Sequence, residues 1–324
     1  MLPTLSEIES AAELVKPVVS PTPQYCWPLL CERLGAEIWV KHENHTPVGA
    51  FKLRGGLVYF NELARSANLP NGVITATRGN HGLSVAYAAR RYGIAATVVV
   101  PHGNSNEKNA AMRALGAGLI EHGEDFQSAR EHAEALAQQR SLHMVPSFHP
   151  LLVAGVATYS MELLRAVPKI DVAYVPIGLG SAICGMVAVR DALGLKTEVV
   201  GVVSARAPAY AHSFRARRPV ECPVATGIAD GMACRTPEPA ALEAIYRGVE
   251  KIVEVTDEEI GSAMRTLFEC THNISEGAGA AALAAAQKEQ SRLAGRRVAI
   301  VLSGGNVDRD VYASVLGAIV ALQG

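Results

Sequence analysis

The sequence has no marked excess of charge of either sign: 30 lysines and arginines face 31 aspartates and glutamates, for a net charge of −1. A basic surface for nucleic acid or for an anionic membrane is therefore not expected. No uninterrupted apolar run reaches the ~18 residues of a membrane-spanning helix, so no membrane partner is expected. The first residues also lack the basic and apolar regions of a signal peptide.

Cysteine spacings typical of metal or redox motifs are also absent. The six cysteines include no CxxC, so we expect reduced, mostly buried thiols in a cytoplasmic protein. No internal repeat or low-complexity tract occurs. What is present is a chain of 324 residues that is 49% hydrophobic, enough for a large core and one or two domains.

Short apolar segments alternate with helical segments along most of the chain. This alternation predicts an α/β fold in which helices cover both faces of a parallel sheet. The strands are predicted at 37–40, 72–76, 95–101, 118–121, 143–146, 172–177, 198–203 and 297–302. The helices are predicted at 51–66, 83–92, 106–115, 126–139, 151–166 and 182–193, and residues 212–235 are predicted to form a loop.

One lysine stands at the start of a predicted helix, after a polar turn. Lys52 belongs to the sequence Phe-Lys-Leu-Arg-Gly, and Pro47 and Gly49 fit a helix entrance. The positive end of the helix dipole favours a neutral amine, and a neutral amine can attack a carbonyl to form a Schiff base. Taken alone, a lysine in a first helical turn is more often an ordinary surface residue.

Three predicted strands end in loops of glycine and small polar residues, at 75–82, 178–182 and 303–306. Backbone N–H groups at such strand ends can hold an anion, and the topology of open sheets tends to place ligands there. One loop of this kind is a weak signal because every βαβ unit has one. Three of them together with Lys52 indicate an active site.

The Phe-Lys-x-Arg-Gly lysine, the Gly-Asn-His loop at 79–81 and the Ser-Gly-Gly-Asn loop at 303–306 follow one another in this order. In these motifs the chain resembles the serine/threonine dehydratase group of the fold-type II pyridoxal-phosphate enzymes, which includes threonine ammonia-lyases, serine racemase and hydroxyamino-acid dehydratases. The resemblance extends from about Thr22 to Asp308. It implies pyridoxal 5'-phosphate as the cofactor, an amino acid as the substrate and a homodimer as the assembly.

The same resemblance implies a two-domain, tryptophan synthase β-like fold with twisted, parallel-rich sheets. Residues 1–67 and 148–324 would form a large cofactor-binding domain and residues 68–147 a small domain, with the active site in the cleft between them. Some threonine ammonia-lyases carry an added C-terminal regulatory domain. Because the sequence ends about fifteen residues after Asp308, feedback control by such a domain is not expected.

The resemblance also implies residue roles. Lys52 would hold the cofactor and later take the substrate's α-proton, and Phe51 would seat the ring. Asn80 would donate its amide to the phenolate oxygen. Ser303 would face the pyridine nitrogen, where a neutral hydroxyl makes the ring a weaker electron sink and favours elimination. Backbone N–H groups of Gly178, Leu179, Gly180, Ser181 and Ala182 would bind the phosphate, and Thr77, Arg78, Gly79 and His81 would bind the substrate, with His81 positioning its loop rather than shuttling protons.

Some of these positions depart from the family pattern. Leu179 and Ser181 interrupt a glycine run that is usually richer, although the Ser181 hydroxyl can itself donate to a phosphate oxygen. Arg78 stands where the group usually has a small residue, which is a serine in the racemase. An arginine is a poor proton donor and acceptor, so racemisation through this position is disfavoured. Arg78 can instead grip a carboxylate or stack on an aromatic group; the alternative is a solvent-facing residue.

A further departure concerns metal binding. Many relatives bind a divalent ion through carboxylates after the strand that follows the phosphate loop. Here Ser204 and Tyr210 align with those carboxylates, and Arg206 adds a positive charge. Because hard cations require charged oxygen ligands, we expect no metal ion.

The leading hypothesis is a dehydratase (ammonia-lyase) that converts a β-hydroxy-α-amino acid to a 2-oxo acid and ammonia. Threonine or serine is the default substrate, and Arg78 leaves phenylserine and hydroxyaspartate open. An amino-acid racemase and a hydroxyaspartate ammonia-lyase on the same scaffold are the alternatives. A β-replacement synthase is a further one, and a non-catalytic binding module is disfavoured because Lys52 is intact.

Overall fold

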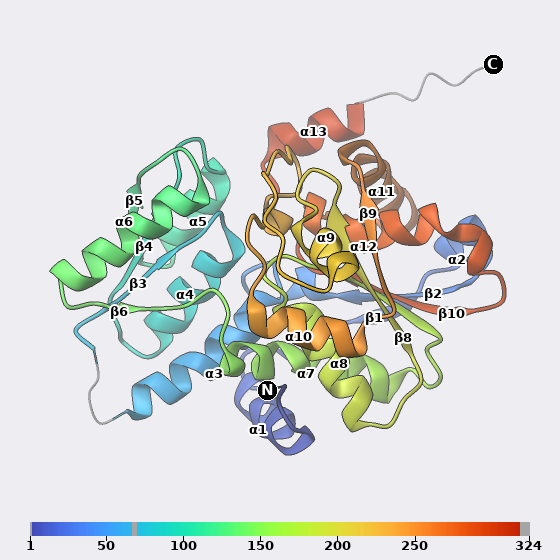
Figure 1. Ribbon diagram of the computed structural model, residues 1–324, viewed down its shortest axis with the longest axis horizontal. Helices are drawn as coiled ribbons and strands as arrows, with labels where there is room; N and C mark the ends of the chain where they lie inside the picture. Colours follow the sequence, from blue (N-terminus) through green and yellow to red (C-terminus); the bar gives the residue numbers. More distant parts are fainter. Residues whose placement is uncertain (1, 67–69, 318–324) are drawn as a thin grey trace.

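The computed structural model describes residues 2–66 and 70–317 of the chain. Its strands form two separate sheets, one of six strands and one of four. In Figure 1 the smaller sheet and its helices lie on the left, and the larger sheet lies on the right. None of the helices in the described ranges combines the length and the apolar character needed to cross a bilayer.

The six-stranded sheet joins segments from both ends of the described chain. β1 (Gln24–Cys26) runs antiparallel to β2 (Glu37–His42), and the other neighbouring strands are parallel. β10 (Arg297–Leu302) lies between β2 and β7 (Val172–Pro176), so that Glu37 pairs with Arg297 and Val172 pairs with Val298. The strand order is β1 (Gln24–Cys26), β2 (Glu37–His42), β10 (Arg297–Leu302), β7 (Val172–Pro176), β8 (Glu198–Ser204) and β9 (Lys251–Val255).

Side chains of β10 alternate between two hydrophobic cores. Val298, Ile300 and Leu302 pack with residues of α11 (Asp257–Thr271) and α12 (Gly277–Lys288). Ala299 and Val301 pack with residues of α7 (Pro150–Ala166) and α8 (Ser181–Ala192). Helices therefore cover both faces of the sheet, which confirms the α/β fold predicted from the β/α alternation.

The four-stranded sheet is parallel throughout. Helices α3 (Lys52–Arg65), α4 (Asn80–Arg91) and α5 (Asn106–Ala114) pack with one face of β4 (Ala96–Val100). Helix α6 (Phe126–Gln139) packs with β3 (Val73–Ala76) and the other face of β4. The strand order is β5 (Gly118–Glu121), β4 (Ala96–Val100), β3 (Val73–Ala76) and β6 (His143–Met144). The remaining helices are α1 (Leu5–Val15), α2 (Pro28–Leu34), α3 (Lys52–Arg65), α4 (Asn80–Arg91), α5 (Asn106–Ala114), α6 (Phe126–Gln139), α9 (Ala209–Ala216), α10 (Pro239–Gly248) and α13 (Arg309–Gly317), with short 3-10 turns η1 (Glu43–His45), η2 (Asp230–Met232) and η3 (Gln290–Arg292).

Helices α3 and α7 touch each other through a pair of glycines. A Cβ atom added at Gly155 would lie 2.3 Å from the carbonyl oxygen of Arg54, and one added at Gly55 would lie 2.7 Å from that of Leu152. A side chain at either position would push the two backbones apart. The glycine pair therefore holds the helix that begins at Lys52 directly against α7.

Some predicted boundaries were wrong. The segment 212–235 is not all loop, because α9 extends to Ala216 and η2 occupies 230–232. The buried residues of α9 lie mostly before this segment, and the arginine-rich composition after them hid the last turn of the helix. The sequence patterns also missed β1, which has three residues, and β9. The predicted domain boundary between residues 67 and 68 lies outside the described residues, and the division into two domains stays a prediction.

Candidate active site

The loop before Lys52 is fastened to the loop after β10. The backbone N–H of Phe51 donates to the carbonyl oxygen of Ser303 over 3.1 Å, and the N–H of Gly305 donates to that of Gly49 over 2.9 Å. The side chain of Asn306 donates to the carbonyl oxygen of Val48 over 2.8 Å. Two of the predicted motifs, far apart in the sequence, therefore meet.

Lys52 is the first residue of α3, and its side chain reaches the first residue of α8. Its Nζ lies 3.3 Å from the Oγ of Ser181 and 5.0 Å from the centre of the Phe51 ring. Within the described part of the chain Lys52 has no ion-pair partner, and burial lowers its pKa to about 8. A lysine in this state supplies a neutral amine near physiological pH.

The predicted phosphate loop requires glycine at two positions. Gly180 has a φ of +100° and precedes α8, and an added Cβ would lie 2.6 Å from the Cβ of Ala241. A Cβ on Gly178 would lie 2.4 Å from the carbonyl oxygen of Gly231. No side chain caps the start of α8, so its first N–H groups, including those of Ser181 and Ala182, are suited to an anion.

A tyrosine from α9 fixes the position of the same loop through hydrogen bonds. The hydroxyl of Tyr210 donates to the carbonyl oxygen of Leu179 over 2.9 Å and accepts from the backbone N–H of Glu238 over 3.0 Å. Ser204 is also engaged, because its Oγ accepts from the N–H of Arg206 over 3.1 Å. Tyr210 therefore has a loop-fixing contact that the alignment with ion-binding relatives did not reveal.

The side-chain amide of Asn80 has a fixed orientation. Its Nδ2 donates to Oε1 of Glu276 over 2.5 Å, and its Oδ1 accepts from Nδ2 of Asn306 over 2.9 Å. A flipped amide would lose both hydrogen bonds, since the carboxylate only accepts and the Asn306 amide nitrogen only donates. The second Nδ2 hydrogen stays available for another acceptor, as the assignment to the cofactor's phenolate oxygen requires.

Lys108 completes this polar cluster. Its Nζ lies 2.7 Å from Asp230 and 3.1 Å from Glu276. Burial opposes the positive charge of Lys108, but the two carboxylates outweigh it and raise its pKa; burial raises the pKa of Glu276. The Lys108 stem also lies against Gly79, where an added Cβ would be 2.4 Å from Cδ. Because Gly79 also has a φ of +157°, no other residue fits this turn well.

The other residues of the Gly-Asn-His loop have different surroundings. Oγ1 of Thr77 accepts from the N–H groups of Gly79 and Gly82 over 2.9 and 3.3 Å. His81 is buried, and burial together with the charge of Lys52 lowers its pKa to about 3, so the imidazole is neutral and suited to positioning. Arg78 is half-buried and forms no hydrogen bond or ion pair with the described residues.

Ser303 follows the last residue of β10 and is buried. Its hydroxyl donates to the carbonyl oxygen of Ala278 over 3.4 Å, a long contact that a better acceptor can replace. The structure therefore brings Lys52, Phe51, Ser303 and Ser181 together, and Asn306 connects Asn80, which binds Glu276, to the loop before Lys52. Sequence reasoning did not identify Glu276, Lys108 or Tyr210 as site residues. Glu276 precedes the glycine-rich start of α12, and this position is the one feature of the local sequence that could have indicated a site residue.

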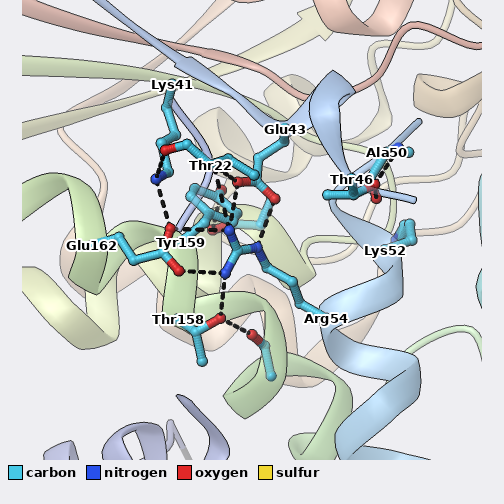
Figure 2. Close-up of polar contacts among 12 residues, drawn as sticks. Thr22, Lys41, Glu43, Thr46, Ala50, Lys52, Arg54, Thr158, Tyr159 and Glu162 are labelled. Carbon is cyan, nitrogen blue, oxygen red and sulfur yellow. Dashed lines mark hydrogen bonds and ion pairs between the residues drawn. The ribbon is translucent and has the colours of Figure 1, made fainter. Parts of the chain in front are cut away.

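A buried network of charges lies beside the helix of Lys52 (Figure 2). Arg54 donates to both oxygens of Glu43, at 2.8 and 3.0 Å, and both side chains are inaccessible to solvent. Arg54 also binds Glu162 at 2.7 Å, and Lys41 binds Glu162 at 2.6 Å. Burial opposes ionisation of Glu162, but Arg54 and Lys41 lower its pKa overall. Two cations and two carboxylates thus tie α3, β2, η1 and α7 together.

Comparison with known proteins connects this site to a family. The family described as "Pyridoxal-phosphate dependent enzyme" matches residues 15–304. The chain is 34% identical over 308 residues to a Thermotoga maritima protein named L-threonine ammonia-lyase, covering 94% of this chain and 76% of the relative. It is 30% identical over 317 residues to the L-threo-3-hydroxyaspartate ammonia-lyase of Saccharomyces cerevisiae, covering 98% and 97%. The structure of maize serine racemase superposes with a TM-score of 0.89, 26% identity and coverage of 97% of each chain.

Proposed function

The chain belongs to the pyridoxal-phosphate-dependent enzyme family, and from this premise we propose that it is a dehydratase that removes water from a β-hydroxy-α-amino acid. The products are a 2-oxo acid and ammonia. The observation that carries the proposal is the position of Lys52, whose pKa is lowered by burial and whose amine lies 3.3 Å from the start of α8.

The residues of the site suit pyridoxal 5'-phosphate. Lys52 is free to bond covalently, the uncapped start of α8 with Gly178, Leu179, Gly180, Ser181 and Ala182 suits a phosphate, and Asn80 keeps one N–H for an oxygen acceptor. When bound, the cofactor supplies the electron sink that makes the α-proton of an amino acid acidic. We assign Ser303 to the ring nitrogen and Phe51 to the ring.

Lys52 serves two purposes in this proposal. Its neutral amine holds the cofactor, and when the substrate takes its place the free amine accepts the α-proton. Burial supports this second step, because a lysine with a pKa of about 8 takes up a proton and releases it again near physiological pH. His81, neutral because burial lowers its pKa, stays a positioning residue of the substrate loop.

The substrate class follows from what the relatives' names have in common. One is named for threonine and the other for threo-3-hydroxyaspartate, and both compounds are β-hydroxy-α-amino acids. We assign the substrate carboxylate to the loop of Thr77, Arg78, Gly79 and His81. Arg78 has no partner among the described residues. Its charge can therefore discriminate between substrates that carry a methyl, a carboxylate or a phenyl group on the β-carbon.

A racemase is the second candidate because maize serine racemase shares the fold. Arg78 argues against it, since a guanidinium is a poor proton donor and acceptor and stands where the racemase has a serine. We further propose that the site lies between a large and a small domain, that no metal is required, and that the protein is a cytoplasmic homodimer.

The test is a panel of β-hydroxy amino acids, each followed for 2-oxo acid and ammonia. Threonine, serine, phenylserine and hydroxyaspartate are assayed in both β-configurations where these exist, with Lys52→Ala as the inactive control. We expect at least one member to yield both products in equal amounts. Formation of the opposite enantiomer without 2-oxo acid would establish the racemase, and turnover only with an added thiol or amine would establish a β-replacement enzyme.

A further inference from the structure

Two cysteine thiols touch each other at the edge of the large sheet. The Sγ atoms of Cys26 and Cys31 are 3.4 Å apart, within hydrogen-bonding distance for sulfur. Cys26 ends β1, the edge strand of the six-stranded sheet, and Cys31 lies in α2, which starts two residues later. The two sulfurs can therefore form a disulfide bond without any large rearrangement of the backbone.

The pair is accessible, unlike the other cysteines. Cys26 and Cys31 are half-buried, whereas the remaining four free cysteines are buried. Neighbouring side chains are open to solvent as well, since Tyr25 is 51% exposed and Leu29 is 55% exposed. A small thiol reagent can therefore reach this pair in the folded protein while the core cysteines stay protected.

The two sulfurs have different surroundings. The Sγ of Cys31 accepts a hydrogen bond from the backbone N–H of Ile38 over 3.2 Å, so a negative charge on this sulfur has a donor beside it. Burial and the contact with Cys31 raise the pKa of Cys26 to about 12, and the carboxylate of Glu37 acts in the same direction. Cys31 is thus the sulfur suited to attack, and Cys26 is the one that stays a thiol until its partner has reacted.

We propose that Cys26 and Cys31 form a redox-active dithiol, which a low-molecular-weight disulfide such as glutathione disulfide closes to an intramolecular disulfide. Nothing in the proposed elimination reaction uses this pair. Disulfides in reducing compartments are usually transient, and an accessible pair that opens and closes with the glutathione ratio fits that behaviour.

The reaction balances with glutathione disulfide as the only oxidant. The Cys31 thiolate attacks one sulfur of glutathione disulfide, which forms a mixed disulfide and expels one glutathione thiolate. Cys26 then loses its proton and attacks Cys31 Sγ, which forms the protein disulfide and expels the second glutathione. Two thiols of the protein are oxidised, and one glutathione disulfide is reduced to two glutathione molecules.

The experiment equilibrates the full-length holoenzyme with glutathione buffers of increasing oxidised fraction, quenches with acid, blocks free thiols and maps peptides by mass spectrometry. We expect a linked Cys26–Cys31 peptide whose fraction rises with the oxidised fraction and falls again on reduction. Indole fluorescence gives a second readout, because the sequence has two tryptophans. Trp27 follows Cys26 in the chain, and Trp39 pairs with Cys26 across the strands. Disulfide closure beside them should quench their emission.

Single variants separate a dithiol from two independent thiols. Cys26→Ser should stop at a glutathione adduct on Cys31, Cys31→Ser should leave Cys26 mostly unmodified, and the buried-site control Cys270→Ser should behave like the parent protein. The proposal is overturned if the parent protein stays reduced in the most oxidising buffer, if it accumulates only glutathione adducts, or if either cysteine pairs elsewhere. Because the parent protein alone distinguishes these outcomes, poor folding of a variant does not obscure the result.

Discussion

The amine of Lys52 lies 3.3 Å from the hydroxyl of Ser181, so the residue expected to hold the cofactor touches the helix start expected to hold its phosphate. A single small molecule can bridge the two only if its reactive carbonyl and its anionic group are a few atoms apart. This contact therefore favours a molecule whose carbonyl and anionic group lie close together.

The first prediction concerns the pH dependence of cofactor attachment. Burial lowers the pKa of Lys52 to about 8, and only the neutral amine attacks a carbonyl, so about a tenth of the protein is reactive at pH 7. The rate at which apo-protein binds pyridoxal phosphate covalently should rise about tenfold per pH unit below 8 and level off above it. Stopped-flow absorbance measures this rate, and a rise that continues beyond pH 10 would show an ordinary, exposed lysine.

The second prediction concerns the identity of the attachment site. Purified protein should be yellow, and borohydride reduction followed by peptide mapping should place the label on Lys52. Lys52→Ala should abolish elimination, because it removes the covalent anchor and the proton acceptor together. A label on another lysine would contradict the assignment, and Lys288, which is exposed and paired with Glu259, serves as the reference for non-specific reduction.

The third prediction concerns substrate choice. Arg78→Ala should keep the cofactor absorption and lower kcat/KM about tenfold to a hundredfold on the preferred substrate, since one lost charge-assisted contact costs on the order of 1.5–3 kcal/mol. A loss confined to hydroxyaspartate would indicate carboxylate binding, and one confined to phenylserine would indicate stacking. Arg78→Lys is the matched control, because it keeps the charge and removes the planar fork. Release of the cofactor would instead assign Arg78 to the cofactor site, and unchanged rates on every substrate would mean that it faces solvent.

The fourth prediction concerns the buried charges beside α3. Glu43→Gln should reduce the free energy of unfolding by about 3–5 kcal/mol, because Arg54 and Lys41 would then share Glu162 alone and one buried positive charge would be uncompensated. Glu243→Gln breaks a salt bridge with Arg247 in which both side chains are more than 70% exposed, and it should cost about 0–1 kcal/mol. Urea denaturation of both variants gives the comparison, and equal losses would show that the buried network contributes no more than a surface pair.

The fifth prediction concerns metal ions. Elimination should continue in excess EDTA, because Ser204 and Tyr210 occupy the aligned ligand positions and their hydroxyls are engaged with backbone groups of Arg206, Leu179 and Glu238. Activity that is lost in chelator and restored by magnesium or calcium would place an ion elsewhere in the protein.

Much of this arrangement could be predicted because it is encoded locally. The strand from 297 to 302 was predicted with its observed bounds, since its apolar residues are contiguous and end at a Ser-Gly-Gly turn. Its place between β2 and β7 was not predictable from periodicity, because pairing with Glu37 joins residues 260 positions apart. β10 takes this central position because both of its faces are buried. The helices that bury them come from distant parts of the chain.

The site residues that the sequence alone could suggest belong to short motifs, as for Lys52, Asn80 and Ser303. Lys108 and Tyr210 could not be found in this way. Lys108 is one charged residue in an ordinary helix, and it becomes informative only when folding buries it between Asp230 and Glu276. Tyr210 in α9 fixes Leu179, which lies in the loop between β7 and α8. A contact between two separate segments of this kind leaves no pattern in the sequence.

The central position of β10 also determines the order in which the molecule can assemble. The four-stranded sheet uses residues 73–144 only, so it can form while the rest of the chain is still being synthesised. The six-stranded sheet has to wait for residues 297–302 before β2 and β7 gain their common neighbour. Long-range parallel pairing of this kind is slow. A nascent chain therefore leaves the backbone N–H and C=O groups on one side of β2 and of β7 without their β10 partners until residues 297–302 have been made, and during that interval these unpaired edges can pair with another chain.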